Sequence, residues 1–229
     1  MNSTLAEDFR IVAMDLRGHG LSDKPRDCYD DSKLWADDVN AVIESLRLDH
    51  PVVSGWSYGG LVILDYIRHY GDDALGGIHL VGAITKLGTE EAMSAITPEF
   101  LALAPGFFSS DVEESVGALG SLLRLCFVEE PSAADLYLML GYNTSVPPYV
   151  RQALFSRSFD NDDILPTIRK PALITHGVDD AIVKPAVVEQ HKAGLKHARI
   201  QMMTKAGHAP FWDDAISFNQ ELRLFAESL

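Results

Sequence analysis

The chain has 229 residues, 47% of them hydrophobic and 23% charged, which is the composition of an ordinary globular protein. Its net charge of −14 argues against nucleic acid or an anionic membrane as a partner, because both require a basic face on the protein. The length suits one large domain, or a core that carries an inserted subdomain.

The first third of the chain alternates short apolar runs with amphipathic segments. Residues 10–16 (RIVAMDL) are rich in β-formers and precede a loop, which predicts a buried strand. Residues 32–48 place apolar side chains at helical spacing behind an acidic N-cap, and residues 51–55 predict a second buried strand. A helix is predicted over residues 60–70, ended by Gly71.

The same alternation returns near the end of the chain. Strands are predicted at residues 77–84, 171–177 and 198–204, and helices at residues 185–195 and 214–228. Strands that alternate with helices are typical of βαβ units, so we expect a mainly parallel sheet flanked by helices.

Residues 86–165 interrupt this pattern, because they contain helical segments and no convincing strand. The segments are 89–103, 111–127, 132–140 and 147–156. A helical insert between two strands is expected to form a cap over the edge of the sheet, which leaves residues 1–85 and 166–229 as the core. Several aromatic side chains of the insert either line a pocket or form the insert's own core, and the burial of apolar helix faces favours the second. They are Phe107, Phe108, Tyr137 and Tyr142.

The stretch SGWSYGG places Ser57 between Gly55 and Gly59. A Gly-x-Ser-x-Gly match arises by chance in on the order of one chain in ten, but here it joins a predicted strand to a predicted helix, as a nucleophile elbow does. In such a turn the serine is strained, and the amide of Tyr58 points toward a developing oxyanion. Trp56, next to the serine, is either a core residue or a substrate contact.

A serine hydroxyl needs a base, and the base needs an orienting acid. Candidates follow Ser57 in the order acid, then histidine, that suits this type of turn. Two carboxylates, Asp179 and Asp180, come after the strand at 171–177 and compete for the role of the acid. The candidate base is His208, just after the last predicted strand.

Four stretches together resemble the α/β-hydrolase family: VAMDLRGHGLSDKP, SGWSYGG, PALITHGVDDAIV and GHAPFWDD. They span almost the whole chain, and the resemblance is to the branch that holds esterases, cofactor-free haloperoxidases (perhydrolases) and carbon–carbon bond hydrolases. It implies an α/β-hydrolase fold with residues 86–165 as its cap. It also selects Asp180 over Asp179, because the family's acid stands three residues after the glycine of the His-Gly pair. A serine in place of aspartate at position 57 argues against haloalkane dehalogenase or epoxide hydrolase chemistry.

The resemblance also implies an N-terminally truncated fold. Relatives carry three more strands before residues 10–16 and a His-Gly loop that donates the second oxyanion amide, and no residue here can be assigned to that loop. Three outcomes are open: the chain is an incomplete version of a longer protein, residues 10–16 pair directly with the strand at 51–56, or another chain fills the place between them. Losing one oxyanion donor costs about 10²–10³ in rate, so the activity could be impaired.

The leading hypothesis is a serine hydrolase that cleaves a small ester or a related acyl compound through Ser57, His208 and Asp180, with the Tyr58 amide on the oxyanion. The alternatives are acyl exchange with peroxide, carbon–carbon bond hydrolysis, and a hydrolase-fold protein without catalysis. We expect a small-molecule substrate and no metal or organic cofactor. No signal peptide or membrane span is expected, and two sparse cysteines are expected to be free thiols in the cytoplasm. The oligomeric state is not indicated.

Overall fold

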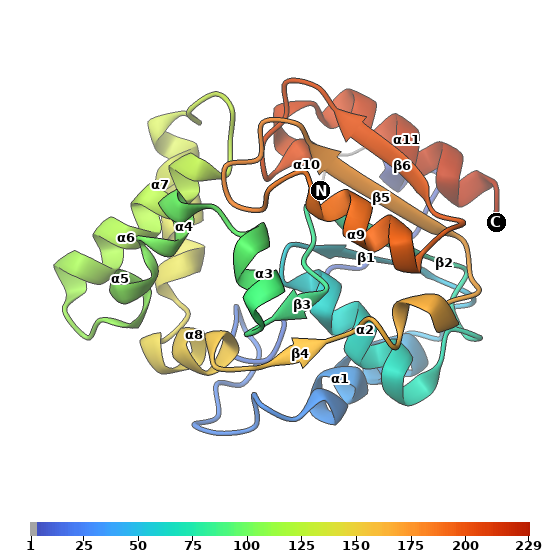
Figure 1. The fold of residues 1–229 in the computed structure, drawn as a ribbon, viewed down its shortest axis with the longest axis horizontal. Helices are drawn as coiled ribbons and strands as arrows, with labels where there is room; N and C mark the ends of the chain where they lie inside the picture. Colours follow the sequence, from blue (N-terminus) through green and yellow to red (C-terminus); the bar gives the residue numbers. More distant parts are fainter. Residues whose placement is uncertain (1–3) are drawn as a thin grey trace.

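A computed structural model describes residues 4–229. A central sheet with helices on both faces forms one part of the molecule, and a group of helices lies to one side of it (Figure 1). This arrangement confirms the expected α/β fold, with a parallel sheet flanked by helices.

Four parallel strands form the main sheet in the order β1-β2-β5-β6. They are β1 (Val52–Trp56), β2 (Gly77–Val81), β5 (Ala172–Gly177) and β6 (Arg199–Met203). Every residue of β2 and β5 is buried, as expected of continuous apolar runs at the centre of a parallel sheet. The four strands confirm the predictions at 51–55, 77–84, 171–177 and 198–204, although β2 ends earlier than expected.

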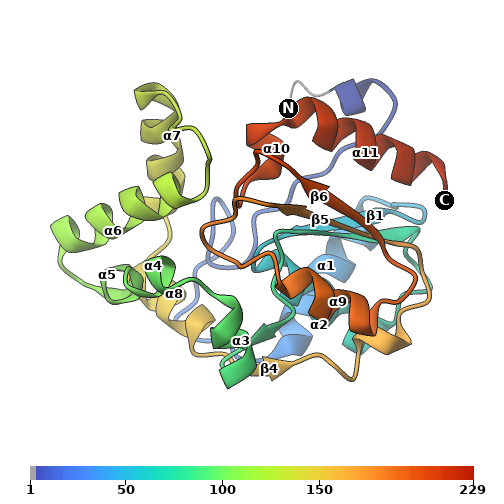
Figure 2. The ribbon, with the colours of Figure 1, turned by 45° about the horizontal axis from the view of Figure 1, so that its top comes forward.

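Helices cover the two faces of the sheet unequally. One face carries α1 (Ser32–Ser45), α2 (Gly59–Tyr70) and α9 (Val187–Gly194), and the other carries α11 (Ala215–Glu227) (Figure 2). The larger apolar core lies under the three helices, and a smaller one lies under α11. Short elements complete this part: η1 (Thr4–Glu7), η2 (Leu165–Thr167) and α10 (Pro210–Asp213).

The strand predicted at residues 10–16 is wrong. No strand forms there, and none of the seven backbone amides makes a hydrogen bond to any residue in 4–229. Ile11 and Val12, which the pattern placed in a buried strand, are exposed. A strand needs a hydrogen-bonded neighbour as well as apolar side chains, and within residues 4–229 β1 is paired only with β2. Direct pairing of residues 10–16 with β1, one of the three outcomes considered, therefore does not occur in this structure.

Six helices lie between β2 and β5: α3 (Glu90–Ala95), α4 (Pro98–Leu101), α5 (Ala104–Phe108), α6 (Val112–Leu125), α7 (Ala133–Thr144) and α8 (Pro148–Phe155). The single helix expected over 89–103 is wrong. A new helix, α4, starts at Pro98 instead. The Thr97 hydroxyl caps it by accepting a hydrogen bond from the Phe100 amide, and proline fits the first helical position.

The insert also contains strand structure, contrary to expectation. Its two ends pair antiparallel through β3 (Lys86–Leu87) and β4 (Phe159–Asp160), so the chain enters and leaves the insert side by side. Each strand is only two residues long, which is too short for a period-2 pattern to be visible in the sequence.

Neither cysteine forms a disulfide among residues 4–229, which confirms free thiols at Cys28 and Cys126. No helix in the same range is long and apolar enough to cross a membrane.

Candidate active site

Ser57 lies in the tight turn between β1 and α2. Its φ of 54° falls in the left-handed region that residues other than glycine rarely adopt. The end of β2 holds the turn from both sides, because the Ser57 amide donates to Val81 O (2.9 Å) and the Ile84 amide donates to Ser57 O (3.2 Å). A Cβ on Gly55 would lie 2.5 Å from Gly59 O, so the turn closes this tightly only with glycine at position 55.

Tyr58 supplies an unused amide donor directly after Ser57. Among residues 4–229 no acceptor is found for this amide, which lies at the N-terminus of α2 where backbone N–H groups attract negative charge. The Tyr58 side chain turns into the protein, where its hydroxyl accepts a hydrogen bond from Arg157 Nη1 (3.0 Å). Burial raises the pKa of Tyr58 to about 12, against the opposing effect of Arg157.

His208 and Asp180 form a buried pair. His208 Nδ1 lies 2.8 Å from Asp180 Oδ2, and the second carboxylate oxygen, Oδ1, accepts the amides of Ile182 (2.8 Å) and Val183 (2.9 Å). Both side chains are almost inaccessible to solvent. The competing carboxylate, Asp179, is exposed, and the described residues offer its side chain no contact with His208. The structure thus brings Asp180 rather than Asp179 to the histidine.

His176 provides one more contact on Asp180, which the sequence did not reveal. Its Nε2 lies 3.2 Å from Asp180 Oδ2 and 3.0 Å from Val183 O. Because both partners are acceptors, the proton is assigned to Nε2. Burial pushes the pKa of Asp180 upward, but hydrogen bonds from His176 and His208 outweigh it and hold the pKa well below its ordinary value. The only signal in the sequence was the four-residue spacing of His176 and Asp180.

Ser57 and the His208–Asp180 pair each lie next to the end of β2. Gly82 follows Val81, which holds the Ser57 amide, and a Cβ on Gly82 would lie 3.3 Å from His208 Nδ1 and 3.4 Å from Asp180 Oδ2. Within the described chain the Ser57 hydroxyl makes no hydrogen bond with the imidazole, and such bonds often tighten only when substrate binds.

The residues considered as substrate contacts fall into two groups. Trp56 is 41% exposed, its ring lies 5.4 Å from that of His208, and its Nε1 donates to His208 O (2.7 Å), so it lies at the candidate site. The other four lie in the insert. Phe107, which is buried, and Phe108, which is half-buried, pack on Phe155 within the insert.

The remaining two, Tyr137 and Tyr142, are exposed on α7, a helix without a buried residue. In residues 4–229 none of the four aromatic residues of the insert makes a ring contact or a hydrogen bond with the three catalytic candidates.

Two further buried histidines lie apart from this site. The ring nitrogens of His79 are both hydrogen-bonded, Nδ1 to the Ser54 hydroxyl (3.0 Å) and Nε2 to the Thr175 hydroxyl (2.9 Å). Neither ring nitrogen of His191 has a hydrogen-bond partner in residues 4–229. Burial lowers the pKa of each histidine to about 3. Over the same range, no group of three or more His, Cys, Asp or Glu side chains is arranged to hold a metal ion.

Comparisons with known proteins agree with the fold. A family profile described as "alpha/beta hydrolase fold" matches residues 1–215. YisY, an AB hydrolase superfamily protein of Bacillus subtilis (strain 168), is 28% identical over 247 residues, which cover 100% of this chain and 85% of YisY.

Two other similar proteins carry activity in their names. The bifunctional esterase/perhydrolase DCH of Acinetobacter calcoaceticus is 30% identical over 233 residues, which cover 98% of this chain and 84% of DCH. The solved structure of the esterase RhEst1 from Rhodococcus sp. ECU1013 matches with a TM-score of 0.92 at 37% identity, covering 98% of this chain and 82% of RhEst1.

Proposed function

The chain belongs to the α/β-hydrolase family and is a hydrolase, and we propose that it cleaves small esters with Ser57 as nucleophile, His208 as base and Asp180 as the orienting acid. One observation carries the proposal. The buried His208–Asp180 pair, 2.8 Å apart, lies at the same end of the sheet as the strained turn that presents Ser57.

The mechanism follows from these positions. Asp180 accepts the Nδ1 proton of His208, which leaves Nε2 as the nitrogen able to take the proton of Ser57 as Oγ attacks the ester carbonyl. The Tyr58 amide donates to the oxyanion of the tetrahedral intermediate. The protonated imidazole then gives its proton to the departing alcohol. Water, deprotonated by His208, attacks the acyl-enzyme and releases the acid.

We propose residues 86–165 as a cap and infer from their charge that the substrate is neutral. The segment has twelve acidic and four basic residues. All four cations are engaged: Lys86 and Arg124 with carboxylates, Arg151 with backbone carbonyls and Arg157 with Asp65. The described part of the cap therefore has no free cation to receive an anionic ester, and its field repels one.

Paired ester substrates test both parts of the proposal. p-Nitrophenyl butyrate and mono-p-nitrophenyl succinate have acyl chains of similar length, but only the second carries a carboxylate. We expect hydrolysis of the butyrate that disappears in Ser57→Ala, and a lower kcat/KM for the succinate that recovers in part with added salt. Hydrolysis retained in a folded Ser57→Ala protein would refute the nucleophile, and equal kcat/KM for the two esters would refute the charge argument.

Acyl exchange with peroxide is the second candidate, because DCH, an esterase/perhydrolase by name, is 30% identical to this chain. The same acyl-enzyme would transfer its acyl group to hydrogen peroxide instead of water, forming a peracid. Peracid-dependent bromination of monochlorodimedone in acetate and peroxide measures this directly. If peracid forms faster than acetate esters are hydrolysed, and Ser57→Ala abolishes it, perhydrolysis is the main activity.

A further inference from the structure

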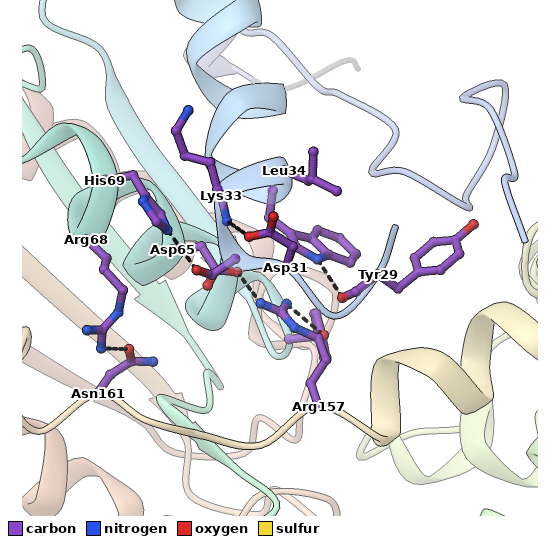
Figure 3. Close-up of polar contacts among 12 residues, drawn as sticks. Tyr29, Asp31, Lys33, Leu34, Asp65, Arg68, His69, Arg157 and Asn161 are labelled. Carbon is purple, nitrogen blue, oxygen red and sulfur yellow. Dashed lines mark hydrogen bonds and ion pairs between the residues drawn. The ribbon is translucent and has the colours of Figure 1, made fainter. Parts of the chain in front are cut away.

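Arg157 lies on the segment that leads from α8 back to β4, and it points into the core part of the protein. Its side chain is 0% exposed and reaches Asp65 on α2 (Figure 3). Nη2 donates to Asp65 Oδ2 (2.7 Å), while Nη1 donates to the hydroxyl of Tyr58 (3.0 Å). One guanidinium therefore joins the end of the helical insert, the helix after the nucleophile turn, and the residue next to Ser57.

Aromatic rings hold this guanidinium in place. It lies 3.9 Å from the ring centroid of Phe159 and 5.0 Å from that of Trp35. The ring of Trp35 is also 5.9 Å from that of Tyr58. Hydrogen bonds at Nη1 and Nη2 and the rings packed around it restrict the Arg157 side chain, and with it the Tyr58 ring that it binds, while its Nε is buried without a partner in residues 4–229.

The energetics argue that stability alone does not explain this buried pair. Burial raises the pKa of Asp65 to about 6, even though the adjacent Arg157 opposes the rise. Replacing a buried ion pair by apolar residues of similar volume is often neutral or stabilising. Because such a pair need not be kept for stability, one that also binds the residue beside the nucleophile is suited to a role in positioning.

We propose that Arg157 is a positioning residue for the oxyanion donor. It fixes the Tyr58 side chain, and through it the direction of the Tyr58 amide, which is bonded to the strained Ser57 and has no acceptor of its own in residues 4–229. Oxyanion donors must lie 2.7–3.1 Å from the position of the developing charge, so a small rotation of this amide weakens transition-state binding. The inference rests on the proposed esterase function.

Arg68 offers a matched control. It also ties α2 to the segment that returns from the insert, through Asp163 (2.8 Å) and Asn161 (2.9 Å), as Figure 3 shows for Asn161. It makes no contact with Tyr58 in the described structure. Arg68→Met therefore loosens the same segment without releasing the oxyanion donor.

The experiment compares Asp65→Leu/Arg157→Met, Tyr58→Phe and Arg68→Met with the wild type. Replacing both members of the pair avoids leaving one charge buried alone. For each variant, thermal unfolding, kcat and KM on p-nitrophenyl butyrate, and the inhibition constant of an alkyl trifluoromethyl ketone are measured. The Ser57 hydroxyl adds to the carbonyl carbon of the ketone and forms a hemiketal oxyanion. The affinity of the ketone therefore reports on the oxyanion site rather than on ground-state binding.

We expect the double variant to fold, to lose about tenfold to a hundredfold in kcat at a KM little changed, and to bind the ketone more weakly by a similar factor. Tyr58→Phe should show the same pattern to a smaller extent, and Arg68→Met should match the wild type. A folded double variant with kcat and ketone affinity within about twofold of the wild type overturns the proposal, as does an equal loss in Arg68→Met. If the double variant does not fold, unchanged values for Tyr58→Phe overturn it. Ester hydrolysis that survives Ser57→Ala would instead refute the proposed function.

Discussion

The two glycines that flank Ser57 should respond in opposite ways to alanine. A Cβ on Gly55 would lie 2.5 Å from Gly59 O and 2.8 Å from Ile63 Cδ1, whereas a Cβ on Gly59 would meet nothing within 4 Å. Both glycines belong to the Gly-x-Ser-x-Gly motif, so the sequence alone makes them look equally necessary. The structure assigns the close approach of strand and helix to Gly55 alone.

The magnitudes follow from these distances. The added Cβ would lie 2.5 Å from Gly59 O whereas ordinary contact begins at 3.4 Å, so Gly55→Ala forces β1 and the start of α2 apart by about 1 Å. Overpacking of this kind costs about 1–3 kcal/mol of stability, and a shift of about 1 Å at Ser57 costs about 10²-fold in rate. Gly59 is the first residue of α2, and alanine there stabilises the helix by at most about 1 kcal/mol.

Urea unfolding followed by circular dichroism measures the first effect, and kcat on p-nitrophenyl butyrate measures the second. We expect Gly55→Ala to be destabilised and slow, and Gly59→Ala to be at least as stable as the wild type. The reasoning is refuted if Gly55→Ala stays within about 0.5 kcal/mol of the wild type in stability, or if Gly59→Ala is destabilised as much as Gly55→Ala.

Three further predictions concern buried titratable groups. Asp180→Asn should lower kcat about 10⁴-fold with the fold intact by circular dichroism, because the amide no longer favours the right tautomer of His208; a loss below about tenfold would contradict the role of the acid. His176→Gln weakens one of the hydrogen bonds that hold the pKa of Asp180 low, so the variant should lose less stability than the wild type as pH falls below about 4 in urea unfolding, and an equal loss would argue against the contact. His191 has a pKa of about 3 in the folded protein and stays neutral there, whereas in the unfolded chain the same imidazole is protonated below about pH 6.5. The folded state is therefore destabilised as pH falls from about 6.5 toward 3, by up to about 1.4 kcal/mol per pH unit. His191→Leu should therefore be more stabilised at pH 5 than at pH 8 in urea unfolding, and an equal gain at both would contradict this account.

Much of the main sheet could be predicted because its information is local. The buried runs of β2 and β5 and the amphipathic helices α1, α2 and α11 follow from patterns a few residues long. The strand at residues 10–16 failed because pairing is not local: its composition suits a strand, but nothing in that composition shows whether a neighbour is present. The break at Pro98 was visible in the sequence, since proline after threonine is a common helix start.

In the candidate site, too, the residues of local motifs could be predicted, whereas contacts between distant residues could not. Ser57 lies in a motif with fixed spacing. The order of residues along the chain pointed to His208 but left Asp179 and Asp180 open, and it was the resemblance to the family that selected Asp180, the carboxylate that the structure brings to His208. Contacts such as that of Arg157 with Asp65 join residues 92 positions apart, and no pattern in a single sequence links them. The aromatic residues of the insert were ambiguous because apolar helical spacing is the same for a pocket wall and for a core.

Covalent labelling of Ser57 tests the central claim most directly. The folded protein would be incubated with a fluorophosphonate, and the adduct would be counted by intact mass and mapped by peptide sequencing. The account predicts one adduct per chain on the peptide that contains Ser57, absent in Ser57→Ala and much slower to form in His208→Ala. An unlabelled folded protein, or an adduct on another residue, would contradict it.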